Sequence, residues 1–126
     1  MKFIYTNKAP KPVGPYSQAV KAGSFIFLSG QIPLDPQTSQ VKGEDIESQS
    51  LQVFKNIKSV LAEENLTFYQ VVKVLVFLTD MKDFSKFNKV YESYFKDHKP
   101  ARSCVEVSAL PKQVKVEVEI IAYLNQ

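Results

Sequence analysis

The sequence predicts an α+β domain in which two helices cover one face of a mixed, six-stranded sheet. Two segments carry apolar side chains at three- and four-residue spacing, which is typical of helices that pack one side against a core. Six shorter segments with apolar runs or alternating polarity indicate strands. Their order along the chain is three strands, a helix, a strand, a helix and two strands, and this order favours the α+β class.

Length and composition fit one globular domain over residues 1–126. The chain is 44% hydrophobic and 23% charged, as soluble globular proteins are. No apolar run approaches the roughly 18 residues that a membrane span needs, and the first residues turn polar too early for a signal peptide. We therefore expect a cytoplasmic protein. The net charge of +3 permits an acidic ligand or a nucleic acid without favouring either.

The N-terminal part is predicted to contain three strands. Residues 2–6 indicate the first strand, and the proline-rich residues 8–15 are expected to run extended over the surface. Residues 18–21 and 24–29 flank a glycine and predict a hairpin. Within it, the continuous apolar run 25–28 suits a strand that is covered on both sides.

The middle of the chain is predicted to form a loop, a helix and a central strand. The loop spans residues 30–43, and the helix spans about 45–63 with a regular apolar stripe. Asn65 follows the helix and can adopt the left-handed conformation that commonly ends helices. Residues 71–78 are apolar and β-branched, which predicts the central strand.

The second helix is expected at about residues 83–97, and the last two strands at 103–108 and 114–124. Opposite the apolar side of this helix fall four lysines: Lys82, Lys86, Lys89 and Lys96. They form either an RNA-binding surface or a solvated face, and we favour the second because no arginine or exposed aromatic accompanies them. His98, just past the last turn, is expected to interact with the negative end of the helix.

Cysteine and histidine usage argues against two kinds of chemistry. Cys104 is the only cysteine and His98 the only histidine, so no intrachain disulfide can form and the usual nitrogen and sulfur ligands of zinc are lacking. We expect no metal site. A nucleophilic role for Cys104 is the alternative to a small hydrophobic role, and we favour the hydrophobic role.

The candidate chemistry lies in the last quarter of the chain. Arg102 stands at the entrance of a predicted strand, where a guanidinium can bind a small carboxylate with two parallel hydrogen bonds or simply form a surface ion pair. Glu117 and Glu119 are two residues apart in the next strand and therefore share a face with Lys115. Either glutamate can move a proton or activate water, and either can form a routine ion pair. The spacing does not choose between them.

Four motifs, in order along nearly the whole chain, resemble the successive signatures of the RidA/YjgF family. They are GPYSQA at 14–19, SGQIP at 29–33, DF followed by NKVY between 83 and 91, and PARS at 100–103. The resemblance implies a chorismate-mutase-like fold and a homotrimer with sites in the clefts between subunits. It also implies a deaminase that hydrolyses 2-imino acids to 2-oxo acids and ammonia without metal or organic cofactor.

The resemblance assigns the catalytic roles residue by residue. Arg102 matches the arginine that binds the substrate carboxylate. Glu117, in preference to Glu119, matches the glutamate that positions or activates water. Tyr16 matches a tyrosine that lines the ligand pocket, although it is also compatible with an aromatic packed on a proline-rich loop.

The resemblance also implies four supporting positions. Ser29 and Gly30 match a pair whose backbone approaches the ligand, although Gly30 is also compatible with a tight bend. Cys104 matches a residue of the pocket wall and should face the same side of its strand as Arg102. Asn88 lies at the edge of the second helix's apolar stripe, and we expect it to brace the segment that presents Arg102.

Two other functions remain open at this point. A non-catalytic member would keep Arg102 for carboxylate capture and act as a regulatory or sensor protein. An RNA-acting protein, an endoribonuclease or a translation inhibitor, would need an acid–base pair beside a basic groove. We expect a small-molecule 2-imino acid substrate in preference to a nucleic acid, and no membrane partner.

Overall fold

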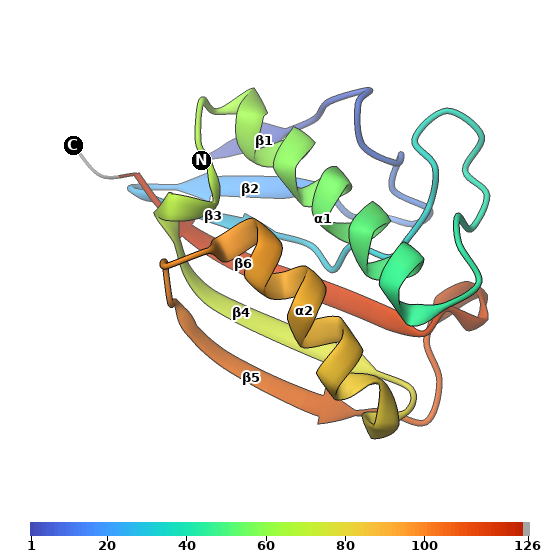
Figure 1. Cartoon of the computed structure of the whole chain (residues 1–126). Coiled ribbons are helices and arrows are strands. Elements are labelled where there is room, and N and C mark those ends of the chain that lie inside the picture. Colours follow the sequence, from blue (N-terminus) through green and yellow to red (C-terminus); the bar gives the residue numbers. More distant parts are fainter. Residues whose placement is uncertain (125–126) are drawn as a thin grey trace.

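The computed structural model describes residues 1–124, and these form one six-stranded mixed sheet with two α-helices on one face (Figure 1). The strands are β1 (Lys2–Ile4), β2 (Ala19–Ala22), β3 (Phe25–Leu28), β4 (Val71–Leu78), β5 (Ala101–Glu106) and β6 (Val116–Tyr123), and the helices are α1 (Ile46–Glu63) and α2 (Phe84–Phe95). The predicted order and fold class are confirmed. Short 3₁₀ turns lie between these elements at Phe68–Gln70, Met81–Asp83 and Pro111–Gln113.

The sheet order is β1-β2-β3-β6-β4-β5, so β1 and β5 form its two edges. Among the described strand pairs, only β4 and β5 run parallel, because α2 crosses over between them. After β3 the chain stays attached to the sheet, since Gln31 and Val118 exchange both backbone hydrogen bonds at 2.8 and 3.1 Å. The predicted loop at 30–43 therefore begins as an extension of the sheet beside β6.

Helix α1 begins where the sequence predicts it. The Asp45 side chain accepts a hydrogen bond from the Ser48 N–H at 2.8 Å and caps the first turn. Past the other end, Asn65 has a φ of 59°, so the predicted left-handed residue is present. The stripe between these ends is buried against the sheet, with Phe54 and Ile57 fully inaccessible.

Helix α2 packs beside α1 through aromatic rings. Phe54 of α1 lies 5.9 Å from the ring centroid of Phe87 and 5.2 Å from that of Tyr94. The prediction for His98 is wrong, because its ring Nε2 lies 2.7 Å from the carbonyl oxygen of Val71 at the start of β4. The ring thus ties the end of the helix to the sheet, and only the backbone N–H of His98 bonds to the helix end, at Phe95.

The face of the sheet away from the helices is uncovered and carries several exposed apolar side chains. The side chains of Phe25, Phe27, Val105 and Tyr123 on this face are 39–44% exposed. Our prediction that the run 25–28 is covered on both sides is wrong for the single chain, because only Ile26 and Leu28 face the helices. No helix among the described residues is long and apolar enough to cross a membrane.

Candidate functional site

A pocket of about 350 Å³ lies on the uncovered side of the sheet, around Glu117 of β6. It is lined by Val13, Tyr16, Ser29, Gly30, Ile32, Pro111, Glu117 and Glu119. Four predicted site residues are therefore brought together here, along with the alternative glutamate. They come from three segments far apart in the sequence. The backbone pairing of Gln31 with Val118 brings the segment of Ser29 and Gly30 beside the strand that carries Glu117.

Gly30 is required in this pocket for space. A Cβ added at Gly30 would lie 2.8 Å from Cδ of Glu117 and nearer still to one of its carboxylate oxygens. No real Cβ contact is that short, so any larger residue would displace the Glu117 carboxyl. The alternative explanation of Gly30 as a tight bend is thus unnecessary, because contact with Glu117 already accounts for the glycine.

The surroundings of the Glu117 carboxyl disfavour its charged form. Burial raises its pKa above the ordinary value, and the nearby charge of Glu119 raises it further. Among residues 1–124, none donates a hydrogen bond to this carboxylate. A half-buried carboxylate without a donor, in a pocket, is a typical environment for a group that exchanges protons with a ligand or water.

Tyr16 is held at the rim of the same pocket by a buried amide that our sequence analysis did not single out. Gln18 is 1% exposed, and its side chain accepts from the Thr6 N–H at 2.7 Å and donates to the Pro10 carbonyl at 2.9 Å. The Ser29 hydroxyl donates to the Ser17 carbonyl at 2.6 Å, which ties the Tyr16 loop to the end of β3. The signal in the sequence for such a residue was the proline-rich segment itself, because its carbonyl oxygens need hydrogen-bond donors from other parts of the chain.

Arg102 lies in a second pocket, also of about 350 Å³, between β5 and α2. Its Nη1 donates to Oδ1 of Asn88 at 2.8 Å, so Asn88 contacts the Arg102 side chain directly. Among the described residues this is the guanidinium's one hydrogen bond, so its other N–H groups are free for a ligand. Cys104 faces the same side, as predicted, and burial raises the pKa of its thiol, which keeps it uncharged at neutral pH.

The structure does not bring Arg102 and Glu117 together within one chain. Arg102 pairs with Val74, which is buried beneath the helices, and Glu117 pairs with Phe77 on the uncovered face. Residues paired across a sheet share a face, so the sheet itself separates the two groups. Within one chain, neither Glu117 nor Glu119 lines the Arg102 pocket, and the glutamate that lines it is Glu92 of α2.

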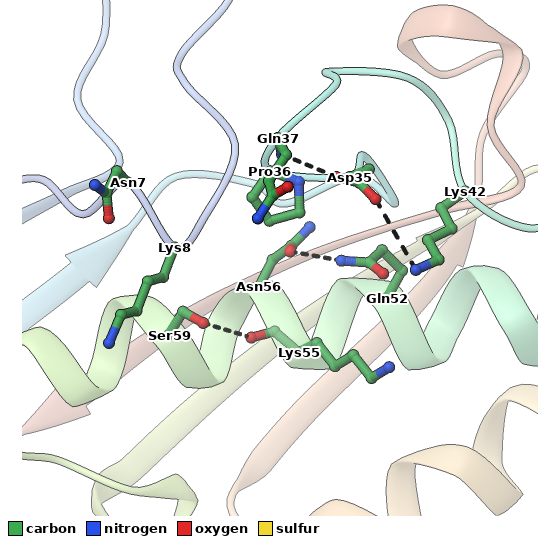
Figure 2. A pocket seen from close by; sticks show the side chains of 10 residues that line it. All are labelled: Asn7, Lys8, Asp35, Pro36, Gln37, Lys42, Gln52, Lys55, Asn56 and Ser59. Atoms are coloured by element: carbon green, nitrogen blue, oxygen red, sulfur yellow. Dashed lines mark hydrogen bonds and ion pairs between the residues drawn. The ribbon is translucent and has the colours of Figure 1, made fainter.

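A larger cavity, about 820 Å³, lies elsewhere and is an open polar depression between α1 and the loop after β3 (Figure 2). Several of its polar groups bond within the chain: Gln52 donates to Asn56 at 2.9 Å, Asn56 donates to the Leu34 carbonyl at 3.0 Å, and Lys42 faces Asp35 at 3.9 Å. Because these groups are satisfied internally, the cavity is not the candidate site. No cluster of three His, Cys, Asp or Glu side chains within residues 1–124 could hold a metal ion.

Comparisons with known proteins identify a family and solved structures with the same fold. The family model described as endoribonuclease L-PSP matches residues 6–124. A RutC family protein of Pyrococcus abyssi is 55% identical over 122 residues, which cover 97% of this chain and 96% of the relative. The structure of yeast Mmf1 is 46% identical with a TM-score of 0.94, and that of Escherichia coli TdcF with bound serine is 42% identical with a TM-score of 0.93; each alignment covers 98% of both chains.

The agreement extends over the whole fold, so the predicted α+β architecture is confirmed by solved structures as well as by the sheet order. The match also includes all the motifs on which the resemblance was based, since they fall within residues 6–124. The chain therefore belongs to the endoribonuclease L-PSP family, whose members are also named RutC and Rid proteins.

Proposed function

We propose that this protein hydrolyses reactive 2-imino acids and their enamines, such as 2-aminoacrylate and 2-iminobutanoate, to 2-oxo acids and ammonia. The observation that carries the proposal is the pairing of unsatisfied groups. Arg102 has free N–H donors, and Glu117 is a carboxylate of raised pKa without a donor. A small molecule with a carboxylate at one end and an electrophilic carbon at the other complements both groups.

The proposed active site forms between two subunits. Arg102 and Glu117 lie on opposite faces of their own sheet, so one substrate can reach both only when they come from different chains. The exposed apolar side chains on the uncovered face, among them Phe25 and Phe27, supply a reason for chains to associate. A homotrimer that buries these faces would have three equivalent sites.

The reaction needs only water and a base. The Arg102 guanidinium binds the substrate carboxylate and fixes the imine carbon. The Glu117 carboxylate takes a proton from a water molecule as the water oxygen adds to that carbon. That proton passes from Glu117 to the nitrogen, which gives a carbinolamine. A second proton then moves from the carbinolamine hydroxyl to the nitrogen through Glu117, the C–N bond breaks, and ammonia leaves as the C=O bond of the 2-oxo acid forms.

Other residues would support this reaction. Tyr16 would order the water or donate to the substrate, and backbone groups near Ser29, Gly30 and Cys104 would hold the nitrogen end. General base assistance of about 10²–10⁴-fold is sufficient, because an imine is already reactive. Removal of the imine would protect pyridoxal-phosphate enzymes, which release such intermediates. The solved structure of TdcF contains bound serine, a small amino acid with a carboxylate. A 2-imino acid is also a small molecule with a carboxylate, so this is compatible with the proposal.

The family name, endoribonuclease L-PSP, makes a ribonuclease the second candidate. Against it, the ring of His98 is engaged with the Val71 carbonyl, and Lys82, Lys86 and Lys89 are exposed and do not line the Arg102 pocket. Cleavage of RNA without an acid–base pair in a basic groove is unfavourable, so deamination is the better proposal. The third candidate function is that of a carboxylate-binding regulatory protein. Such a protein would differ from the proposed deaminase by lacking turnover.

A coupled assay tests the proposal. A serine or threonine dehydratase generates the imine in place, and release of 2-oxo acid is followed with the wild-type protein, with Arg102→Ala and with neither. Faster release with the wild type alone is the expected result. Unchanged release together with saturable binding of 2-oxobutanoate would contradict catalysis and favour the regulatory alternative.

A further inference from the structure

Arg102 is the only arginine among the 16 lysine and arginine residues of the chain. The other residues in this count are all lysines. This points to a role for Arg102 that uses a property of the guanidinium besides its charge. That property is its flat shape, which lets it stack on aromatic rings while its edge forms hydrogen bonds. The surroundings of Arg102 provide such rings.

One row of α2 forms these surroundings. Phe84, Asn88, Tyr91 and Phe95 are spaced four, three and four residues apart, so they lie along one line of the helix. The Arg102 Cζ lies 4.6 Å from the ring centroid of Tyr91 and 5.6 Å from that of Phe84. Both distances are within the range of cation–π attraction. Asn88, between the two rings in sequence, accepts the hydrogen bond from Nη1.

The Tyr91 ring is itself fixed from behind. It stacks on Phe95 with 4.3 Å between centroids and 20° between planes, and Phe95 is 2% exposed. Phe95 stacks on His98 at 6.4 Å, and His98 is bonded to the Val71 carbonyl. The ring under the guanidinium therefore rests on the core and on the sheet.

We propose that Phe84 and Tyr91 are positioning residues that fix the plane of the Arg102 guanidinium, so that its free edge is presented to the substrate carboxylate before binding. The part of this proposal that concerns substrate rests on the proposed function. Two rings and one amide restrict the guanidinium's rotation. A head group already restricted in the free protein loses less entropy when it forms two parallel hydrogen bonds, and this favours tighter binding.

The Tyr91 hydroxyl provides a matched control. It is buried and has no hydrogen-bond partner among the described residues. Tyr91→Phe thus keeps the ring under the guanidinium and removes only an unpartnered group, whereas Tyr91→Leu removes the aromatic face. Tyr94 controls for the loss of any aromatic from α2, because it packs on Phe54 and Phe68 and has no contact with Arg102.

The test compares Phe84→Leu and Tyr91→Leu with Tyr91→Phe and Tyr94→Leu. Because the chain has one arginine, a single side-chain Nε–H signal in NMR reports on Arg102 in the unliganded protein. We expect faster guanidinium rotation in Phe84→Leu and Tyr91→Leu, and wild-type rotation in the two controls. In the imine assay, KM should rise about tenfold in Tyr91→Leu, equivalent to about 1.4 kcal/mol, with a much smaller change in kcat.

The two measurements separate the two proposals. Altered Arg102 rotation in a protein that shows no deaminase activity would support the positioning of Arg102 and contradict the proposed function. Unchanged rotation and unchanged KM in both leucine variants would overturn the positioning role. An equal KM increase in Tyr94→Leu would also overturn it, since any loss of helix packing would then suffice. Phe84 is only partly buried, so its variant keeps the test valid if Tyr91→Leu fails to fold.

Discussion

The two halves of the proposed site are held in place in opposite ways. Arg102 is surrounded by contacts: its guanidinium donates a hydrogen bond to Asn88 and lies over two aromatic rings. By contrast, no described residue donates a hydrogen bond to the Glu117 carboxylate, and the absence of a side chain at Gly30 leaves space for this carboxylate. A group that binds a permanent charge benefits from fixed geometry, whereas a group that exchanges a proton benefits from a pKa that burial can raise.

The largest effect is expected from removing the base. Glu117→Gln should lower kcat by about 10²–10⁴-fold, because the amide cannot take a proton from water, while KM changes little. Steady-state kinetics of the coupled assay measure this, with Glu119→Gln as the control. If Glu119→Gln lost more activity than Glu117→Gln, the assignment of the base to Glu117 would be reversed.

Removing the anion clamp should have a slightly smaller effect. Arg102→Ala should lower kcat/KM by about 10²–10³-fold, the usual loss when one partner of a charge-assisted pair is removed, and should leave the fold intact. Arg102→Lys keeps the charge but not the flat, forked shape, and should restore only part of the activity. Equal activity of the lysine variant and the wild type would mean that charge alone matters.

A smaller loss is expected from filling the space beside Glu117. Gly30→Ala should displace the Glu117 carboxyl and lower kcat by about 10²-fold or less, the typical result of a misplacement near 1 Å. Binding of 2-oxobutanoate should change little, because the change lies away from Arg102. A wild-type kcat in this variant would show that the contact with Glu117 can relax without consequence.

The raised pKa of Glu117 predicts a pH-dependent stability difference. A carboxyl with a raised folded pKa contributes stability at low pH, and this contribution is lost as the pH rises through the folded pKa. Glu117→Gln should therefore unfold at a higher temperature than the wild type at neutral pH, and the difference should disappear below about pH 4. Thermal unfolding at both pH values measures this. A less stable variant at neutral pH would contradict the buried, unpaired environment of the carboxyl.

The same pKa should be visible in the activity. Because the base must be ionised, kcat/KM should rise with pH through the raised pKa of Glu117. Burial is the main cause of the shift and Glu119 the second, so Glu119→Gln should move the acid limb of the profile to lower pH. An unmoved limb would show that Glu119 has no influence on Glu117.

Local features of this protein follow from its sequence to a large degree. Helix α1 starts close to its predicted beginning at residue 45 and ends before the left-handed Asn65, because capping and periodicity are short-range properties. The pocket around Glu117 is harder to predict from the sequence, since it depends on the backbone pairing of Gln31 with Val118. The family resemblance supplied those residues, and periodicity alone left Glu117 and Glu119 equivalent.

The relation between Arg102 and Glu117 depends on long-range pairing. Their separation by the sheet follows from the order β6-β4-β5 and from the parallel register of β4 with β5, which no local pattern encodes. The role of the α2 aromatics was also missed, because a stripe containing Phe84 and Tyr91 has the pattern of ordinary core packing. Asn88 within that stripe was the one sign that it serves a polar partner.

The most direct test of a site shared between chains is complementation. Arg102→Ala and Glu117→Gln are each expected to be nearly inactive, and the two are unfolded together in equal amounts and refolded as mixed oligomers. Since each site would take Arg102 from one chain and Glu117 from another, random mixing should restore about a quarter of the wild-type activity. Confirmed mixed oligomers with no restored activity would contradict the account, because each site would then lie within one chain.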